Sequence, residues 1–68
     1  MSEFLMNIKE VAEVCDQLDG GYEVKALAET YSSMFEEINS NVMAKRLAKA
    51  GFQKKSLGRG KSNIWFID

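Results

Sequence analysis

Apolar residues recur every three or four positions in the first part of the chain, which is the spacing of one face of an α-helix. This stripe consists of Phe4/Leu5, Ile8, Val11/Ala12, Cys15 and Leu18. It predicts a first helix over about residues 3–18. The sequence "DGG" at 19–21 is expected to end this helix, because glycine readily takes the left-handed conformation of a helix C-cap.

A second helical face follows after the glycines. Its apolar positions are Val24, Leu27/Ala28, Tyr31 and Phe35. They predict a helix over about residues 22–36. The end of this helix stays open between positions 31 and 37, because Ser32 and Ser33 are equally suited to cap a new turn and to lie within a continuing helix.

A third helix is predicted over about residues 41–50. The sequence "NSN" at 39–41 offers three residues that favour the N-cap position, and Gly51 is the expected C-terminal stop. Between them, "VMAKRLAKA" is rich in good helix formers. The apolar face of this helix comprises Met43, Leu47 and Ala50, and the cations that project outward from it are Lys45, Arg46 and Lys49.

The pattern changes after Gly51 from a helical period to two short runs that suit strands. "FQKKS" and "NIWFI" flank "LGRGK", whose glycines suit a hairpin loop, so we expect a hairpin over about residues 52–67. A lone hairpin is marginal in water and must pack on the helices. The packed face is either Trp65 with Ile67 or Ile64 with Phe66. The predicted fold is mainly α with a C-terminal β-hairpin, in a single domain of residues 1–68.

Charge is divided unevenly along the 68 residues, although the net charge is only −1. Residues 1–37 carry two basic and nine acidic side chains, a net charge of −7. Residues 38–68 carry seven basic side chains and one acidic side chain, a net charge of +6. Such a division favours binding of a polyanion by the basic half.

Three helices and a hairpin, with a basic third helix and a basic hairpin tip, form the architecture of a winged helix-turn-helix. The segment "MAKRLAKAGFQKKSLGRGKSNIWFI" resembles the closing part of winged-helix domains in phage and mobile-element proteins. These include the C-terminal domains of virus-type primase-helicases. The resemblance covers about residues 24–68 and implies a phage or mobile-element regulator, or a domain of a replication protein.

The resemblance implies that residues 41–50 form a recognition helix for the major groove of duplex DNA, and that "SLGRGKS" forms the wing on the DNA backbone. Physical chemistry points the same way, because an α-helix fits the major groove and lysine or arginine neutralises phosphates. Arg46 is the best candidate for a bidentate contact with guanine. The predicted DNA-binding residues are Asn39, Ser40, Asn41, Lys45, Arg46, Lys49, Lys54, Lys55, Arg59 and Lys61.

These candidates differ in the contact that we expect. The three residues at 39–41 lie at a helix N-terminus, which suits phosphates or base edges, although their first role is to cap the helix. Lys54 and Lys55 are neighbours on a strand and point to opposite faces, so at most one of them is expected to face DNA. Arg59 and Lys61 lie at the hairpin tip and are the best placed for the wing contact.

The alternative function is a protein-interaction module that uses the acidic N-terminal half, and residues 3–18 are a candidate surface for a homodimer or another protein.

An enzyme is not expected, because no histidine organises the carboxylates, and no cofactor is expected. One cysteine and no histidine exclude a Cys/His zinc site. No apolar run would span a membrane and the first residues lack a secretory signal, so we expect a cytoplasmic protein.

Overall fold

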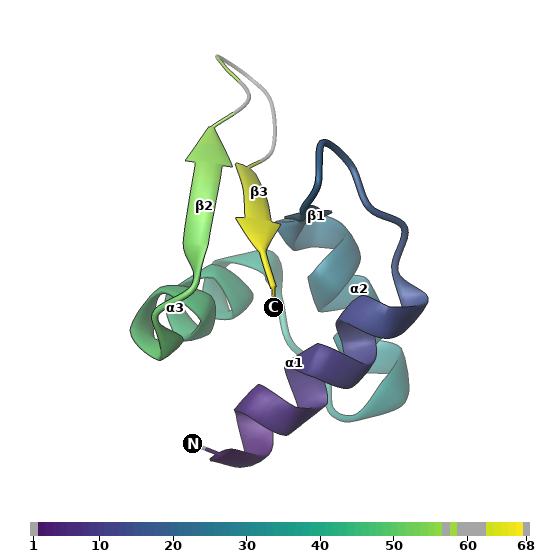
Figure 1. Ribbon diagram of the computed structural model, residues 1–68. Helices are drawn as coiled ribbons and strands as arrows, with labels where there is room; N and C mark the ends of the chain where they lie inside the picture. Colours follow the sequence, from purple (N-terminus) through teal and green to yellow (C-terminus); the bar gives the residue numbers. More distant parts are fainter. Residues whose placement is uncertain (1, 57, 59–62, 68) are drawn as a thin grey trace.

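The computed structural model describes residues 2–56, 58 and 63–67. Three helices and three strands follow one another along the chain (Figure 1). They are α1 (Ser2–Val14), β1 (Tyr22–Glu23), α2 (Val24–Met34), α3 (Ser40–Ala50), β2 (Gln53–Ser56) and β3 (Asn63–Phe66). The strands form one antiparallel sheet in the order β1-β3-β2. The prediction of three helices followed by a β-hairpin is therefore confirmed, and β1 is a strand that was not predicted.

The first helix is shorter than the predicted 3–18, because α1 ends at Val14. The "DGG" sequence forms a tight turn of its own. Leu18 and Gly21 exchange two backbone hydrogen bonds, of 2.8 and 3.0 Å, and φ is 54° at Asp19 and 85° at Gly20. Positive φ at both central positions defines a type I′ turn, for which Asp-Gly is a favoured pair. The prediction that these residues cap the first helix is therefore wrong, because α1 ends before them at Val14.

The second helix begins at Val24 rather than at 22, because the two residues before it belong to the sheet. Tyr22 pairs with Trp65 and Glu23 pairs with Ile64. Gly21 makes this close approach possible. A Cβ atom at Gly21 would overlap with Cγ2 of Ile64 and lie 2.8 Å from the carbonyl oxygen of Trp65. Only glycine fits at this place beside β3.

The end of α2 at Met34 falls inside the predicted interval of 31–37. Ser32 and Ser33 both lie within the helix. The hydroxyl of Ser32 donates to the carbonyl oxygen of Ile38 and accepts from the Ile38 backbone N–H, each at 3.0 Å. One serine thus stays in the helix and also holds the turn that leads to α3.

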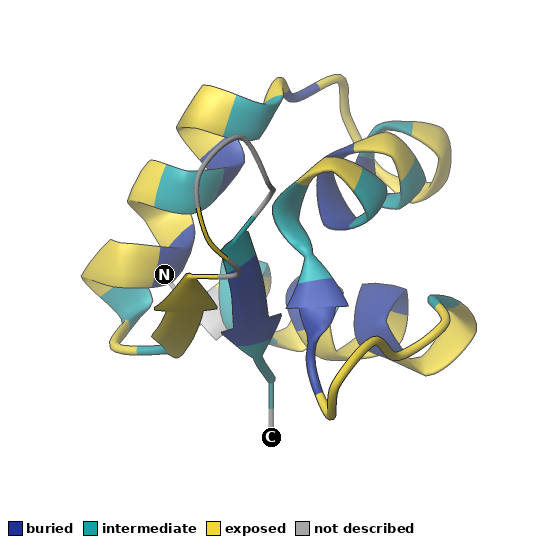
Figure 2. Cartoon of the chain, turned by 90° about the horizontal axis from the view of Figure 1, so that it is seen from above, coloured by how far each residue is buried: buried dark blue, intermediate teal, exposed yellow. Residues whose placement is uncertain are grey.

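The middle strand of the sheet is buried on both sides (Figure 2). Trp65 faces the helices and joins a core cluster that includes Ile8, Leu27 and Leu47. Ile64 points to the other face, beside Gly21, and is also fully buried. Phe66 and Ile67 are only partly buried. The predicted pair of Trp65 and Ile67 forms the packed face, because Trp65 belongs to the core cluster and Ile67 packs against it. Ile64 and Phe66 lie together on the opposite face, beside Gly21.

Candidate nucleic-acid interface

The outer face of α3 is polar and basic. Met43 and Leu47 point into the core and are 0% exposed. At 100° per residue, the positions opposite them on the helix are Asn41, Lys45 and Lys49, and all three are exposed. Lys45 and Lys49 are four residues apart and therefore neighbours on this face. The two lysines stand where the sequence predicted them.

Both ends of α3 are fixed by local contacts. Oδ1 of Asn39 accepts a hydrogen bond of 2.8 Å from the backbone N–H of Val42, which is the predicted N-cap. At the other end Gly51 has a φ of 96°. The N–H of Gly51 donates to the Ala48 carbonyl and that of Phe52 to the Leu47 carbonyl, each at 3.1 Å, which is a Schellman motif. This motif sets the direction in which β2 leaves the helix.

We expect Asn39→Ala to lower the free energy of unfolding by about 1 kcal/mol, because the substitution leaves the Val42 N–H without its cap. Asn41→Ala is the matched control, since Asn41 is an exposed residue inside the same helix. Its effect should stay within about 0.5 kcal/mol. Urea unfolding followed by circular dichroism measures both. Equal losses for the two variants would contradict the capping role of Asn39.

The N-terminus of α3 lies beside two carboxylates. Glu36 and Glu37 are exposed and immediately precede the turn that leads to Asn39. Ser40, the first residue of α3, is partly buried. Acidic side chains near a helix N-terminus stabilise the helix, but they repel a phosphate at the same place. The most favourable surface for a polyanion is therefore the middle and C-terminal part of α3, around Lys45 and Lys49.

Arg46 does not stand on the outer face with the two lysines. Its Nη1 lies 3.3 Å from Oε1 of Glu36, and its guanidinium carbon lies 5.9 Å from the centre of the Phe4 ring. The side chain is 43% exposed. The predicted guanine reader is thus turned toward α1 and the α2–α3 turn. The partners Glu36 and Phe4 were not predicted as site residues, because no spacing in the sequence links them to Arg46.

Two more lysines extend from β2, which is exposed at all four positions. Lys54 pairs with Trp65 and Lys55 with Ile64, so the two side chains lie on opposite faces of the sheet, as predicted. Lys54 shares the face on which the helices pack, and its Nζ lies 5.7 Å from the centre of the Trp65 ring. Lys54 is therefore the lysine of β2 that faces the same side of the sheet as α3.

Positive charge is concentrated in these two elements. The helix α3 contains Lys45, Arg46 and Lys49, the strand β2 contains Lys54 and Lys55, and neither element contains an acid. None of the four lysines forms an ion pair with another residue in the described ranges. Arg59 and Lys61, which were predicted for the hairpin tip, lie outside the described residues.

The acidic half presents a different surface. Glu10 and Glu13 are exposed on α1, and two large apolar side chains are exposed on the same helix, Met6 at 68% and Val14 at 64%.

Cys15 is partly buried, and its Sγ lies 3.2 Å from Oγ1 of Thr30. Within the described ranges, no three residues among His, Cys, Asp and Glu gather as a metal site would require.

No helix in the described part of the chain has both the length and the apolar character needed to cross a membrane. Comparisons of the chain with models of protein families, with curated proteins and with solved structures each find no match.

Proposed function

We propose that this chain is a winged helix-turn-helix module that binds duplex DNA. In this proposal α3 is the recognition helix in the major groove, and the hairpin of β2 and β3 is the wing on the DNA backbone. The order of elements supports the proposal, since three helices are followed by a hairpin. The second strand of this hairpin, β3, also pairs with β1.

The observation that carries the proposal is the placement of cations on α3 and β2. Lys45 and Lys49 stand on the face of α3 opposite the core, and Lys54 follows on the strand that leaves the same helix. Duplex DNA presents closely spaced phosphates on both sides of a groove that accommodates one α-helix. A basic helix joined directly to a basic strand suits such a target. Arg59 and Lys61 add two more cations to the proposed wing.

The proposed biological setting is that of a regulator in a phage or mobile element, or of a domain in a replication protein. This part of the proposal rests on the resemblance of "MAKRLAKAGFQKKSLGRGKSNIWFI" to winged-helix domains of such proteins.

Fluorescence anisotropy with a labelled random duplex of about 20 base pairs tests the proposed binding. If about four lysines contact phosphates, the affinity should weaken about a hundredfold as the salt concentration rises from about 50 to about 200 mM. The weakening follows from the release of counterions from the DNA when lysines bind. Absence of binding at low salt, or an affinity that does not change with salt, would refute the proposal.

A further inference from the structure

Arg46 is held by residues from two other parts of the chain. Glu36 in the turn after α2 supplies the carboxylate at 3.3 Å, and Phe4 in α1 supplies the ring beneath the guanidinium at 5.9 Å. The Phe4 ring belongs to an aromatic row, in which it lies 5.8 Å from Tyr31, and Tyr31 lies 5.2 Å from Phe35. The guanidinium therefore contacts both the turn after α2 and the helix α1.

This position is adjacent to the proposed DNA-binding surface. A hollow between α1 and α3 is lined by Glu3, Phe4, Tyr31, Glu36, Arg46 and Lys49. Lys49 is one of the two lysines on the outer face of α3. Arg46 and Lys49 border the same hollow, so the inference below requires only that the long Arg46 side chain rotates toward Lys49.

The contact between Arg46 and Glu36 is open to water. The two side chains are 43% and 66% exposed. Exposed ion pairs of this kind shift an equilibrium by only about two- to fivefold. A DNA phosphate or the O6 and N7 atoms of guanine offer the guanidinium an equivalent or better partner. DNA can therefore displace Glu36 from Arg46, and removal of the Glu36 carboxylate should change the affinity for DNA by a measurable factor.

We infer that Glu36 competes with DNA for the guanidinium of Arg46, and that this carboxylate thereby limits the affinity of the protein for DNA. The inference rests on the proposed function and adds Glu36 to it as a positioning residue. In the protein without DNA, Glu36 and Phe4 hold Arg46 back from the outer face of α3. In the complex, Arg46 leaves Glu36 and contacts the DNA.

The test compares Glu36→Gln with Glu37→Gln in the anisotropy titration with duplex DNA. Both substitutions remove one exposed carboxylate next to α3, so the general gain from a more positive net charge is the same in both. Glu37 forms no ion pair with another described residue, although it borders a hollow with Arg46. We expect Glu36→Gln to bind DNA about two- to fivefold more tightly than Glu37→Gln.

The same pair of substitutions in an Arg46→Gln background isolates the role of the arginine. There, the difference between Glu36→Gln and Glu37→Gln should disappear, because no guanidinium remains to be released. Equal affinities of the two variants in the original background would overturn the inference, as would a difference that persists in the Arg46→Gln background. Thermal unfolding of each variant verifies that all of them are folded at the temperature of the titration.

The outcomes separate the inference from the proposed function. Salt-dependent binding by the unmodified protein, together with equal affinities of the Glu36→Gln and Glu37→Gln variants, would refute the inference alone. Absence of binding by the unmodified protein and by all variants would refute the proposed function and the inference together.

Discussion

Trp65→Ala should leave the chain largely unfolded at room temperature. The indole is 2% exposed and packs in the core between the sheet and the helices. Removing a buried aromatic side chain of this size costs about 3–5 kcal/mol. A chain of 68 residues has a total stability of roughly 3–10 kcal/mol. A chain this short is expected to lie near the lower end of that range, where the loss cancels the whole stability. Far-ultraviolet circular dichroism should therefore show a large loss of helix.

Trp65→Phe is the matched control for this substitution. The indole Nε1 is buried and has no hydrogen-bond partner in the described structure. Phenylalanine keeps most of the aromatic ring and removes this polar atom, whose burial without a hydrogen bond costs free energy. We expect a cost below about 1.5 kcal/mol in urea unfolding. A Trp65→Ala variant that unfolds at the same urea concentration as the original protein would contradict the central place of Trp65 in the core.

The double substitution Lys45→Glu with Lys49→Glu should abolish most DNA binding. Both lysines stand on the outer face of α3, where we propose that the phosphates lie. Two lost phosphate contacts should weaken the affinity roughly a hundredfold at about 0.1 M salt. They should also reduce the slope of log affinity against log salt by about 1.8. Anisotropy titrations at several salt concentrations measure both quantities.

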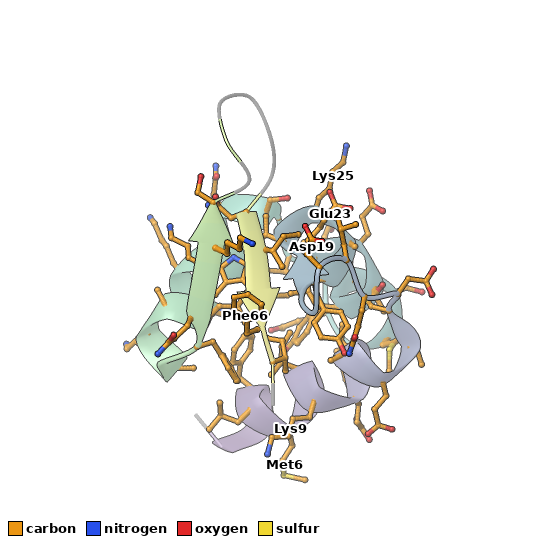
Figure 3. All side chains as sticks on the ribbon, turned by 45° about the horizontal axis from the view of Figure 1, so that its top comes forward. Met6, Lys9, Asp19, Glu23, Lys25 and Phe66 are labelled. Atoms are coloured by element: carbon orange, nitrogen blue, oxygen red, sulfur yellow. The ribbon has the colours of Figure 1, made fainter. Side chains whose placement is uncertain are left out.

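Lys9→Glu with Lys25→Glu is the matched control, because it changes the net charge by the same amount. These two lysines are exposed on α1 and at the start of α2, away from α3 and β2 in Figure 3. We expect only a small, general weakening from this control. An equal weakening by both double variants would mean that overall charge, and not α3, attracts the DNA. No effect of either pair would favour the alternative, a protein-interaction module that uses the acidic half.

The third helix could be predicted closely from the sequence because its determinants are local. Asn39 caps α3 and Gly51 ends it, and each acts on backbone groups within a few residues. The same holds for the outward direction of Lys45 and Lys49, which follows from the helical period alone. Features of this kind need no knowledge of the rest of the fold.

The strand β1 could not be predicted in this way. It has only two residues, and its partner is β3 at the other end of the sequence. Two residues are too few for an alternating pattern, and they directly precede the apolar period of α2, which predicts a helix that includes them. A local signal did exist in Asp19-Gly20, since this dipeptide favours the type I′ turn found there. This turn signal is consistent with the shorter first helix, which ends at Val14.

The surroundings of Arg46 also depend on tertiary structure. A helical projection of α3 places Arg46 with the other cations, but it does not include Glu36 or Phe4, which come from other elements. The position of one side chain at the edge of a helix face is decided by the neighbouring elements that reach it. The sequence thus predicts which residues are basic and exposed, and it does not predict which of them are paired.

The edge position of β2 has a consequence for how copies of this chain behave in concentrated solution. An outer strand with exposed backbone groups is a template on which a second chain can add a strand, and such additions lead to aggregation. On β2 the two central residues are Lys54 and Lys55. If two copies of β2 lay side by side, their lysines would lie close together and repel one another. The charges proposed to attract DNA therefore also protect the open edge of the sheet.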